Sequence, residues 1–172
     1  MIFMTRRNNG FSLVELLIVL AVMAALISTI TPVAMNAIKK AKATQVAQNL
    51  KTLSSALQHA AYLNGANSDG QIKSHGNTAI ELNDLGRDLP KDSNGNDLYG
   101  FAYTRTSGGT YYAVVYYAGG DVDLATAGEI LGNQSLEYTS TNLDADDSLI
   151  EDGAPYRSSA SDVYYYFYFT IY

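Results

Sequence analysis

The fold is decided by the stretch Gly10-Phe11-Ser12-Leu13-Val14-Glu15-Leu16-Leu17-Ile18-Val19-Leu20 and its continuation to Met35. Almost every side chain in this run is apolar, and Glu15 is its single charged residue. A helix needs about 20 apolar residues to span the core of a bilayer, so the run is long enough to cross a membrane. A carboxylate in that setting needs an interfacial position or a positive partner. Basic residues flank the run on both sides: Arg6, Arg7, Lys39, Lys40 and Lys42.

Three interpretations of this stretch compete. A secretory signal peptide would be cleaved after its apolar core, near Ala21–Ala25 or Ser28, but the run is too long and Glu15 interrupts its start. A signal anchor would leave one membrane helix holding a domain outside. The third interpretation rests on the order of features: a short basic leader, Gly10, Phe11, a hydroxyl residue, Glu15, and an apolar run with Pro32 near its end.

This order resembles the processing signal of type IV pilins and of the pseudopilins of type II secretion. The resemblance covers roughly the first fifth of the chain. It implies that a prepilin peptidase cuts after Gly10 and that the new N-terminal residue, Phe11, is N-methylated. It also implies that the apolar helix is kept, and that pilus or secretion machinery moves it from the inner membrane into a homo-polymer. Arg6 and Arg7 predict a cytoplasmic N-terminus.

Glu15 and Pro32 each have two interpretations. Ser12 and Glu15 have the spacing of a capping box, in which each side chain bonds the backbone amide of the other residue. The resemblance implies instead that Glu15 pairs with the methylated amine of Phe11 in a neighbouring subunit, and the two roles are compatible. Pro32 predicts a kink, with hydroxyls of the preceding turn bonding the freed backbone groups. The resemblance implies that Ile27–Pro32 melts in a filament.

The sequence predicts three parts: a cleaved leader at residues 1–10, a transmembrane and assembly segment at 11–35, and a globular head at 36–172. One helix runs from Ser12 to about Leu63, and Asn64-Gly65 ends it. Its second half carries a single apolar stripe, which predicts that this half packs against the head. The residues of the stripe are Val46, Leu50, Leu53, Leu57 and Ala60.

The rest of the head alternates short apolar runs with turns. Three strands are predicted, at Leu98–Thr104, Tyr111–Ala118 and Val163–Tyr172. A short helix or a turn is predicted at Ala79–Leu85, and a short helix at Leu124–Leu131. Thr106-Ser107-Gly108-Gly109 has the composition of a hairpin turn. A small, mostly antiparallel sheet covering the helix stripe makes an α+β domain, and the resemblance implies a type IV pilin-like fold.

Composition adds constraints on the head. The chain has 172 residues, a formal net charge of −6, no cysteine and 14 tyrosines. No disulfide can close the C-terminal region, which is a departure from many type IV pilins. No basic face with interleaved aromatics points to a specific nucleic acid. Tyrosines fall on both alternating faces of the predicted strands, so we expect some of the outer sheet face to meet neighbouring subunits.

Oxygen donors gather around Gly95. This segment is either a polar turn or a calcium loop. The donors are Asp92, Asn94, Asn96 and Asp97. The segment resembles the region before the first strand of major pseudopilins, although it lacks that pattern's second proline. A second acidic run, also a candidate calcium site, comprises Asp144, Asp146, Asp147, Glu151 and Asp152.

The sequence contains no motif that indicates catalysis: it has no nucleophile motif and no phosphate loop. Neither His59 nor His75 has a second histidine at the spacing of a metal site. We therefore interpret the chain as a structural pilin-like subunit rather than an enzyme, destined for a cell-surface pilus. One alternative is a pseudopilin of a periplasmic secretion or DNA-uptake machine. Another is a membrane-anchored binding domain that never polymerises.

Overall fold

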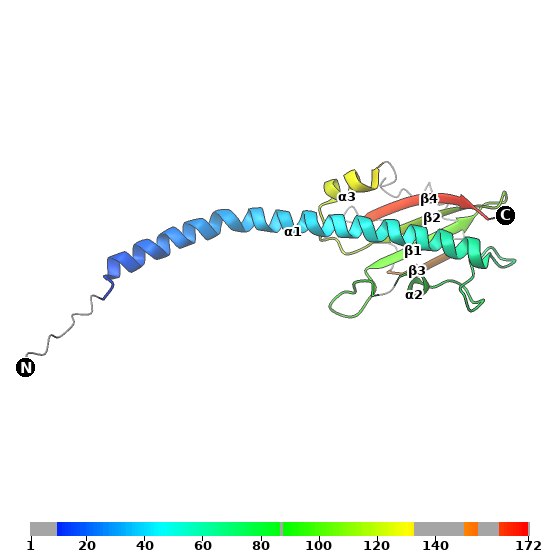
Figure 1. Ribbon diagram of the computed structural model, residues 1–172, viewed down its shortest axis with the longest axis horizontal. Helices are drawn as coiled ribbons and strands as arrows, with labels where there is room; N and C mark the ends of the chain where they lie inside the picture. The colour runs from blue at the N-terminus through cyan, green and yellow to red at the C-terminus, as the bar shows by residue number, and fades with distance from the viewer. Residues whose placement is uncertain (1–9, 87, 133–149, 155–161, 172) are drawn as a thin grey trace, which may run out of the picture. The chain divides into compact units, whose positions relative to one another are not determined.

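The computed structural model describes residues 10–86, 88–132, 150–154 and 162–171 (Figure 1). The chain divides into two compact units, Met1–Ile38 and Lys39–Tyr172. Of the predicted leader, only Gly10 lies within the described residues.

Helix α1 (Leu13–Asn64) begins in the first unit, where it accounts for the regular structure of the described residues, and continues into the second. Its bounds confirm the helix predicted from Ser12 to about Leu63. Gly65 ends it with a φ of +70°, and the Gly65 N–H bonds the Ala61 carbonyl oxygen at 3.0 Å. The predicted stop at Asn64-Gly65 is thus confirmed, because a left-handed residue is easiest for glycine.

The second half of α1 buries one stripe against the sheet. The predicted positions Val46, Leu50, Leu53 and Leu57 are buried, whereas Ala60 is only half-buried. The next turn of the helix brings Ala61 onto the buried line, four residues after Leu57. The full stripe is Ala43, Val46, Ala47, Leu50, Leu53, Ser54, Leu57 and Ala61.

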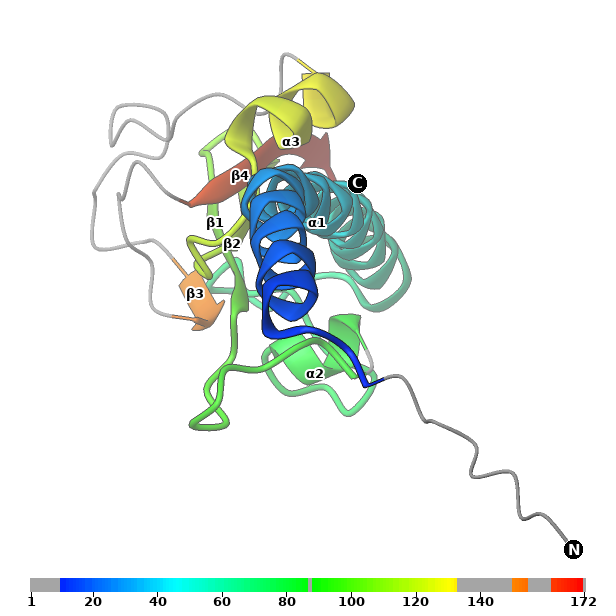
Figure 2. The ribbon, with the colours of Figure 1, turned by 90° about the vertical axis from the view of Figure 1, so that its left-hand side faces the viewer.

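The sheet has four antiparallel strands in the order β3-β1-β2-β4 (Figures 1 and 2). The predicted strands correspond to β1 (Tyr99–Arg105), β2 (Thr110–Tyr117) and β4 (Val163–Thr170). The predicted total of three strands is wrong, because β3 (Ile150–Gly153) pairs with β1. This strand escaped prediction because a four-residue edge strand with two carboxylates has no alternating apolar pattern.

The connections follow the predicted turn and helices. In the β1–β2 hairpin, Thr106 N donates to the Thr110 carbonyl oxygen at 2.9 Å, and Gly109 has a φ of +82°. Helix α3 (Leu124–Leu131) has the predicted bounds. Of the predicted helix or turn at Ala79–Leu85, a helix forms at α2 (Leu82–Leu85), whereas Ala79 pairs with Lys73 in an isolated β-bridge.

The sheet separates two apolar clusters. Its inner face packs on α1 through buried aromatic rings, and the largest of these are Tyr99, Phe101, Tyr103, Tyr111 and Tyr117. Its outer face carries a smaller cluster of Ala102, Val114, Tyr116, Ala154 and Tyr164. The result is an α+β domain, with a long N-terminal helix on an antiparallel sheet, consistent with a type IV pilin-like fold.

Candidate functional site

The start of α1 is held by a reciprocal pair of hydrogen bonds. Ser12 N donates to Glu15 Oε2 at 2.8 Å, and Glu15 N donates to Ser12 Oγ at 3.2 Å. Leu16 N then donates to the Ser12 carbonyl oxygen at 3.2 Å, the first bond of the helix. The capping box predicted from sequence is confirmed. It also places the Glu15 charge in the first turn, where the helix dipole favours a negative group.

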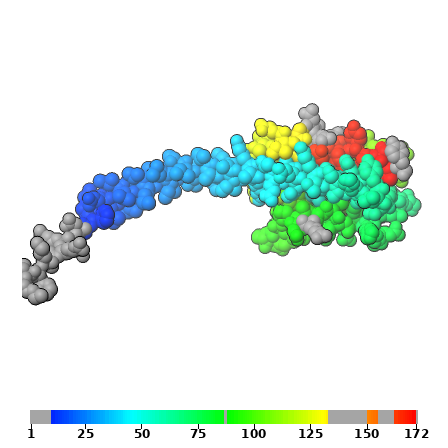
Figure 3. Space-filling view, in the orientation of Figure 1, coloured from blue at the N-terminus to red at the C-terminus, as the bar shows by residue number. Residues whose placement is uncertain are grey.

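The apolar half of α1 exposes side chains around its whole circumference. Every residue from Gly10 to Ala41 is exposed within the described chain (blue to light blue in Figure 3). The large apolar side chains from Phe11 to Ile38 are each between 51% and 89% exposed. An 18-residue window of α1 has a mean hydropathy of 2.6, so this helix is long and apolar enough to cross a membrane. Water is an unfavourable surrounding for such a surface.

Pro32 lies inside α1, and helical structure continues through it. Proline has no N–H to donate to the Ser28 carbonyl, four residues earlier. Two nearby hydroxyls bond the carbonyls just before that one: Thr29 Oγ1 donates to Leu26 O at 2.9 Å, and Thr31 Oγ1 donates to Ile27 O at 2.7 Å. The kink at Pro32 and the melting of Ile27–Pro32 stay predictions.

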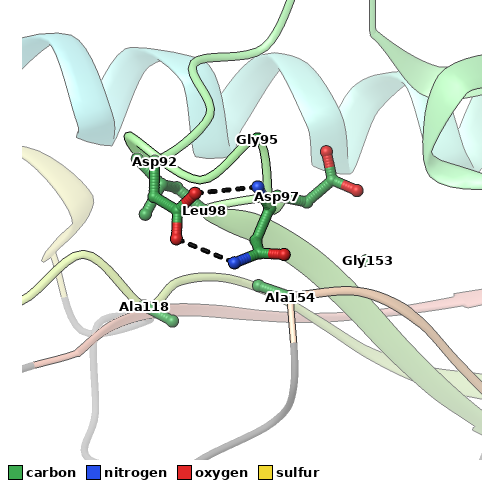
Figure 4. A pocket seen from close by; sticks show the side chains of 8 residues that line it. Asp92, Gly95, Asp97, Leu98, Ala118, Gly153 and Ala154 are labelled. Atoms are coloured by element: carbon green, nitrogen blue, oxygen red, sulfur yellow. Dashed lines mark hydrogen bonds between the residues drawn. The ribbon is translucent and has the colours of Figure 1, made fainter.

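The candidate calcium loop is a tight turn organised by Asp92 (Figure 4). The Asp92 carboxylate accepts from Asn94 N and Asn96 N at 2.8 Å each, and from Asn96 Nδ2 at 2.9 Å. These bonds, the one from the Asn96 side chain above all, lower the pKa of Asp92 because they stabilise its charged form. Gly95 completes the turn with a φ of +84°.

The second carboxylate of this loop points elsewhere. Asp97 pairs with Lys91 at 2.8 Å, and Figure 4 shows its carboxylate turned away from Asp92. An open cleft of about 570 Å³ lies between the loop and Ala118, Gly153 and Ala154. Among the described residues, no three acidic or histidine side chains converge. Calcium at this loop would have to draw Asp97 away from Lys91. It stays a prediction, which melting curves in calcium and in EDTA would test.

The second acidic run falls largely outside the described residues, which exclude Asp144, Asp146 and Asp147. Its other two members are neighbours on β3 and therefore face opposite sides of the sheet. Asp152 accepts a hydrogen bond from the Leu82 backbone N–H at the start of α2. Glu151 Oε1 lies 3.1 Å from the Tyr116 hydroxyl.

Tyrosines line both faces of the sheet, as predicted. The outer face of β2 and β4 carries Tyr112, Tyr116, Tyr164, Tyr166 and Tyr168, which follows from the strand register. Tyr116 is fully buried, and its hydroxyl donates to the Ala154 carbonyl oxygen. Tyr112 and Tyr166 stack with ring centroids 6.3 Å apart, and Tyr168 is 69% exposed. The outer face thus combines a buried patch with an exposed aromatic one.

Sequence reasoning missed a polar cluster at the start of the head. Lys42 Nζ forms an ion pair with Asp121 Oδ2, and the Tyr117 hydroxyl donates to Asp121 Oδ1 at 2.9 Å. Burial alone would raise the pKa of Asp121, but the bonds from Lys42 and Tyr117 hold it below its ordinary value. Lys42 and Asp121 are 79 residues apart, so no local signal could have found this pair.

Comparison with known proteins adds one match. Residues 5–31 match the family described as the prokaryotic N-terminal methylation motif, the signature of type IV pilin and pseudopilin precursors. No curated protein sequence and no solved structure matches the chain. The motif supports a type IV pilin-like or pseudopilin precursor, and it fits a membrane-anchored one. Proteins with it are structural and generally not enzymes, and the motif implies processing by a peptidase in general.

Proposed function

We propose that the chain is the precursor of a structural subunit of a type IV pilus-like filament. In this proposal it is cleaved between Gly10 and Phe11 and polymerises through the apolar half of α1. The supporting observation is that the motif at residues 5–31 overlaps the first half of α1, which is apolar and exposed on every side. A helix that is hydrophobic all round is stable only where something apolar covers it. Lipid covers it before assembly, and identical helices cover it afterwards.

Glu15 acts both in the membrane-bound precursor and in the assembled filament. In the single chain its Oε2 atom closes the capping box, and no donor among the described residues reaches Oε1. Cleavage after Gly10 creates a positive amine on Phe11. Among packed apolar helices, attraction between that amine and the Glu15 carboxylate of a neighbour is stronger than in water. The pair forms only at one axial register, so it would select the correct position of an incoming subunit.

Two substitutions separate assembly from capping. Glu15→Gln removes the charge but keeps the capping box, because glutamine serves at this position as well as glutamate. Ser12→Ala removes the Oγ acceptor but keeps the Glu15 carboxylate. We expect Glu15→Gln to lower the yield of filaments sheared from the cells at least tenfold, while the amount of membrane-bound precursor stays normal. Ser12→Ala should still assemble. Normal filament yield from Glu15→Gln would contradict the proposal.

The sheet would form the outer layer of the filament, and the exposed part of its tyrosine face would contact neighbouring subunits. Tyr168 supports this, because a large aromatic side chain that is 69% exposed suits a half-wet contact between proteins. Assembly would be driven by separate pilus machinery.

A pseudopilin is the closest alternative. It is favoured by the Asp92–Tyr99 segment, which resembles major pseudopilins, and by the absence of cysteine. The tyrosine-rich head favours a surface fibre instead. Negative-stain images of the assembled protein separate long surface fibres from short periplasmic ones. A chain that stays monomeric in the membrane would indicate an anchored binding domain.

A further inference from the structure

The lysines of α1 differ in what surrounds them. Residues 16–68 contain four lysines and no acidic residue. Lys42 pairs with Asp121, and Lys51 Nζ donates to the Ile130 carbonyl oxygen at 2.7 Å. Lys39 and Lys40 are exposed, and no described residue bonds or pairs with their amino groups. Within the part of the chain that the structure describes, these two amino groups are therefore open to a further partner.

Their place along α1 indicates where that partner lies. The uncharged stretch Leu16–Ile38 contains 23 residues, which as a helix extend about 35 Å. A bilayer has a hydrocarbon core about 30 Å thick, and it measures about 40–45 Å with its headgroups. With Glu15 at one surface, Lys39 and Lys40 reach the headgroup layer of the opposite leaflet. Their aliphatic stems can follow the apolar helix while the amino groups reach the phosphates.

Lys39 and Lys40 carry positive charge at the membrane surface where positive residues are unfavourable. Positive residues close to a membrane helix favour the cytoplasmic side. Arg6 and Arg7 serve that orientation, whereas Lys39 and Lys40 on the far side oppose it. An anionic group at that surface would offset the opposition. Consecutive helix residues point about 100° apart, so each lysine can contact a separate phosphate.

We propose that Lys39 and Lys40 bind the phosphate groups of anionic phospholipids in the leaflet opposite the N-terminus, and so hold the precursor at a fixed depth. This inference rests on the membrane stage of the proposed function and does not depend on polymerisation. Extraction into a filament would have to release both contacts.

Native mass spectrometry of the full chain tests the proposal. The protein is released from mixed micelles that contain either phosphatidylglycerol or phosphatidylcholine, and the lipids retained by each monomer are counted. We expect the wild type to retain phosphatidylglycerol in preference to phosphatidylcholine. In the double variant Lys39→Gln/Lys40→Gln, the ratio of retained phosphatidylglycerol to retained phosphatidylcholine should fall roughly fivefold for each lysine that is replaced. Glutamine keeps the helix, which circular dichroism checks.

The control is Lys73→Gln/Lys91→Gln, which removes the same charge from the loops of the head and should retain lipid like the wild type. Equal retention by the Lys39/Lys40 variant and the wild type would overturn the proposal. An equal loss in the control would overturn it too, because net charge alone would then explain retention. A lipid-independent dimer in the wild type that the Lys39/Lys40 variant lacks would also overturn it, since the lysines would then contact a second copy. Filament assays play no part, so a failure to polymerise would be seen separately.

Discussion

At the scale of single residues, the backbone is crowded at Gly153 in β3. Its φ is +99°, and an added Cβ would lie 2.5 Å from the Tyr99 carbonyl oxygen and 2.7 Å from Gly100 Cα. Gly109 has a similar φ of +82°, but a Cβ there meets nothing within 4 Å. The two glycines therefore share the cost of a left-handed backbone and differ in the space around them.

Alanine substitutions at these two glycines should differ in their effect on stability. We expect Gly109→Ala to lower the free energy of unfolding by about 1–2 kcal/mol, the cost of the left-handed conformation. Gly153→Ala should cost about 1–3 kcal/mol more, because the β1–β3 pairing must shift to admit the methyl group. Urea unfolding of the full chain in detergent measures both. Equal losses would show that β3 does not pack against β1 as described.

Buried tyrosine hydroxyls give the head a sensitivity to alkali. Burial raises the pKa of Tyr103 to about 12, and this effect outweighs the hydrogen bond from Ile72 N at 3.0 Å, which on its own lowers the pKa because it stabilises the charged oxygen. A group whose folded-state pKa exceeds its ordinary value of about 10 contributes stability that is complete below that pH. This contribution is lost as the pH rises towards 12.

We therefore expect the free energy of unfolding to fall steadily between about pH 10 and pH 12. Tyr103→Phe should weaken that dependence, because it removes one of the titrating groups. The comparison uses the slope against pH, since the lost bond to Ile72 lowers stability by about 1 kcal/mol at every pH. Tyrosinate absorbance follows the same titration. An unchanged slope in Tyr103→Phe would contradict the assignment.

At the scale of elements, α1 is supported in two different ways. Its first half has a capping box and no described tertiary contact around its surface, whereas its second half is buried along one stripe. Two leucines of the second half allow a direct comparison. Leu57 is fully buried, and Leu63 is 83% exposed on the same helix.

Leu57→Ala should lower the free energy of unfolding by about 2–5 kcal/mol, because it leaves a cavity between α1 and the sheet. Leu63→Ala makes the same chemical change outside the core, so we expect an effect within about 0.5 kcal/mol. Thermal unfolding followed by circular dichroism measures both. Similar losses at the two positions would contradict the packing of α1 on the sheet.

Elements were predictable where their signals were local. The capping box depends on residues three apart, and the bounds of α3 follow from one short apolar window, so both could be derived from sequence. Strand β3 could not, because Ile150–Gly153 is acidic and acquires its structure by pairing with β1. Likewise, the pairing of Lys42 with Asp121 depends on the folded arrangement of α1 and the segment after β2.

At the scale of the whole molecule, the charge is divided between segments. All charged residues between 16 and 68 are lysines, and every acidic residue except Glu15 comes after this segment. Lys42 pairs with the acidic side chain of Asp121 after β2, and Lys51 donates to the Ile130 carbonyl oxygen of α3, so both lysines hold this part of the head on α1. In the proposed function, the exposed apolar half of α1 changes its surroundings from lipid to other subunits.

The central claim is that the apolar helix is kept after processing, with Phe11 as its new N-terminus. Mass spectrometry of the N-terminal peptide of the protein purified from its native membrane tests this directly. The account predicts a peptide that begins at Phe11 and carries an N-methyl group. A peptide that begins at Met1, or one that begins beyond the apolar run, would contradict it.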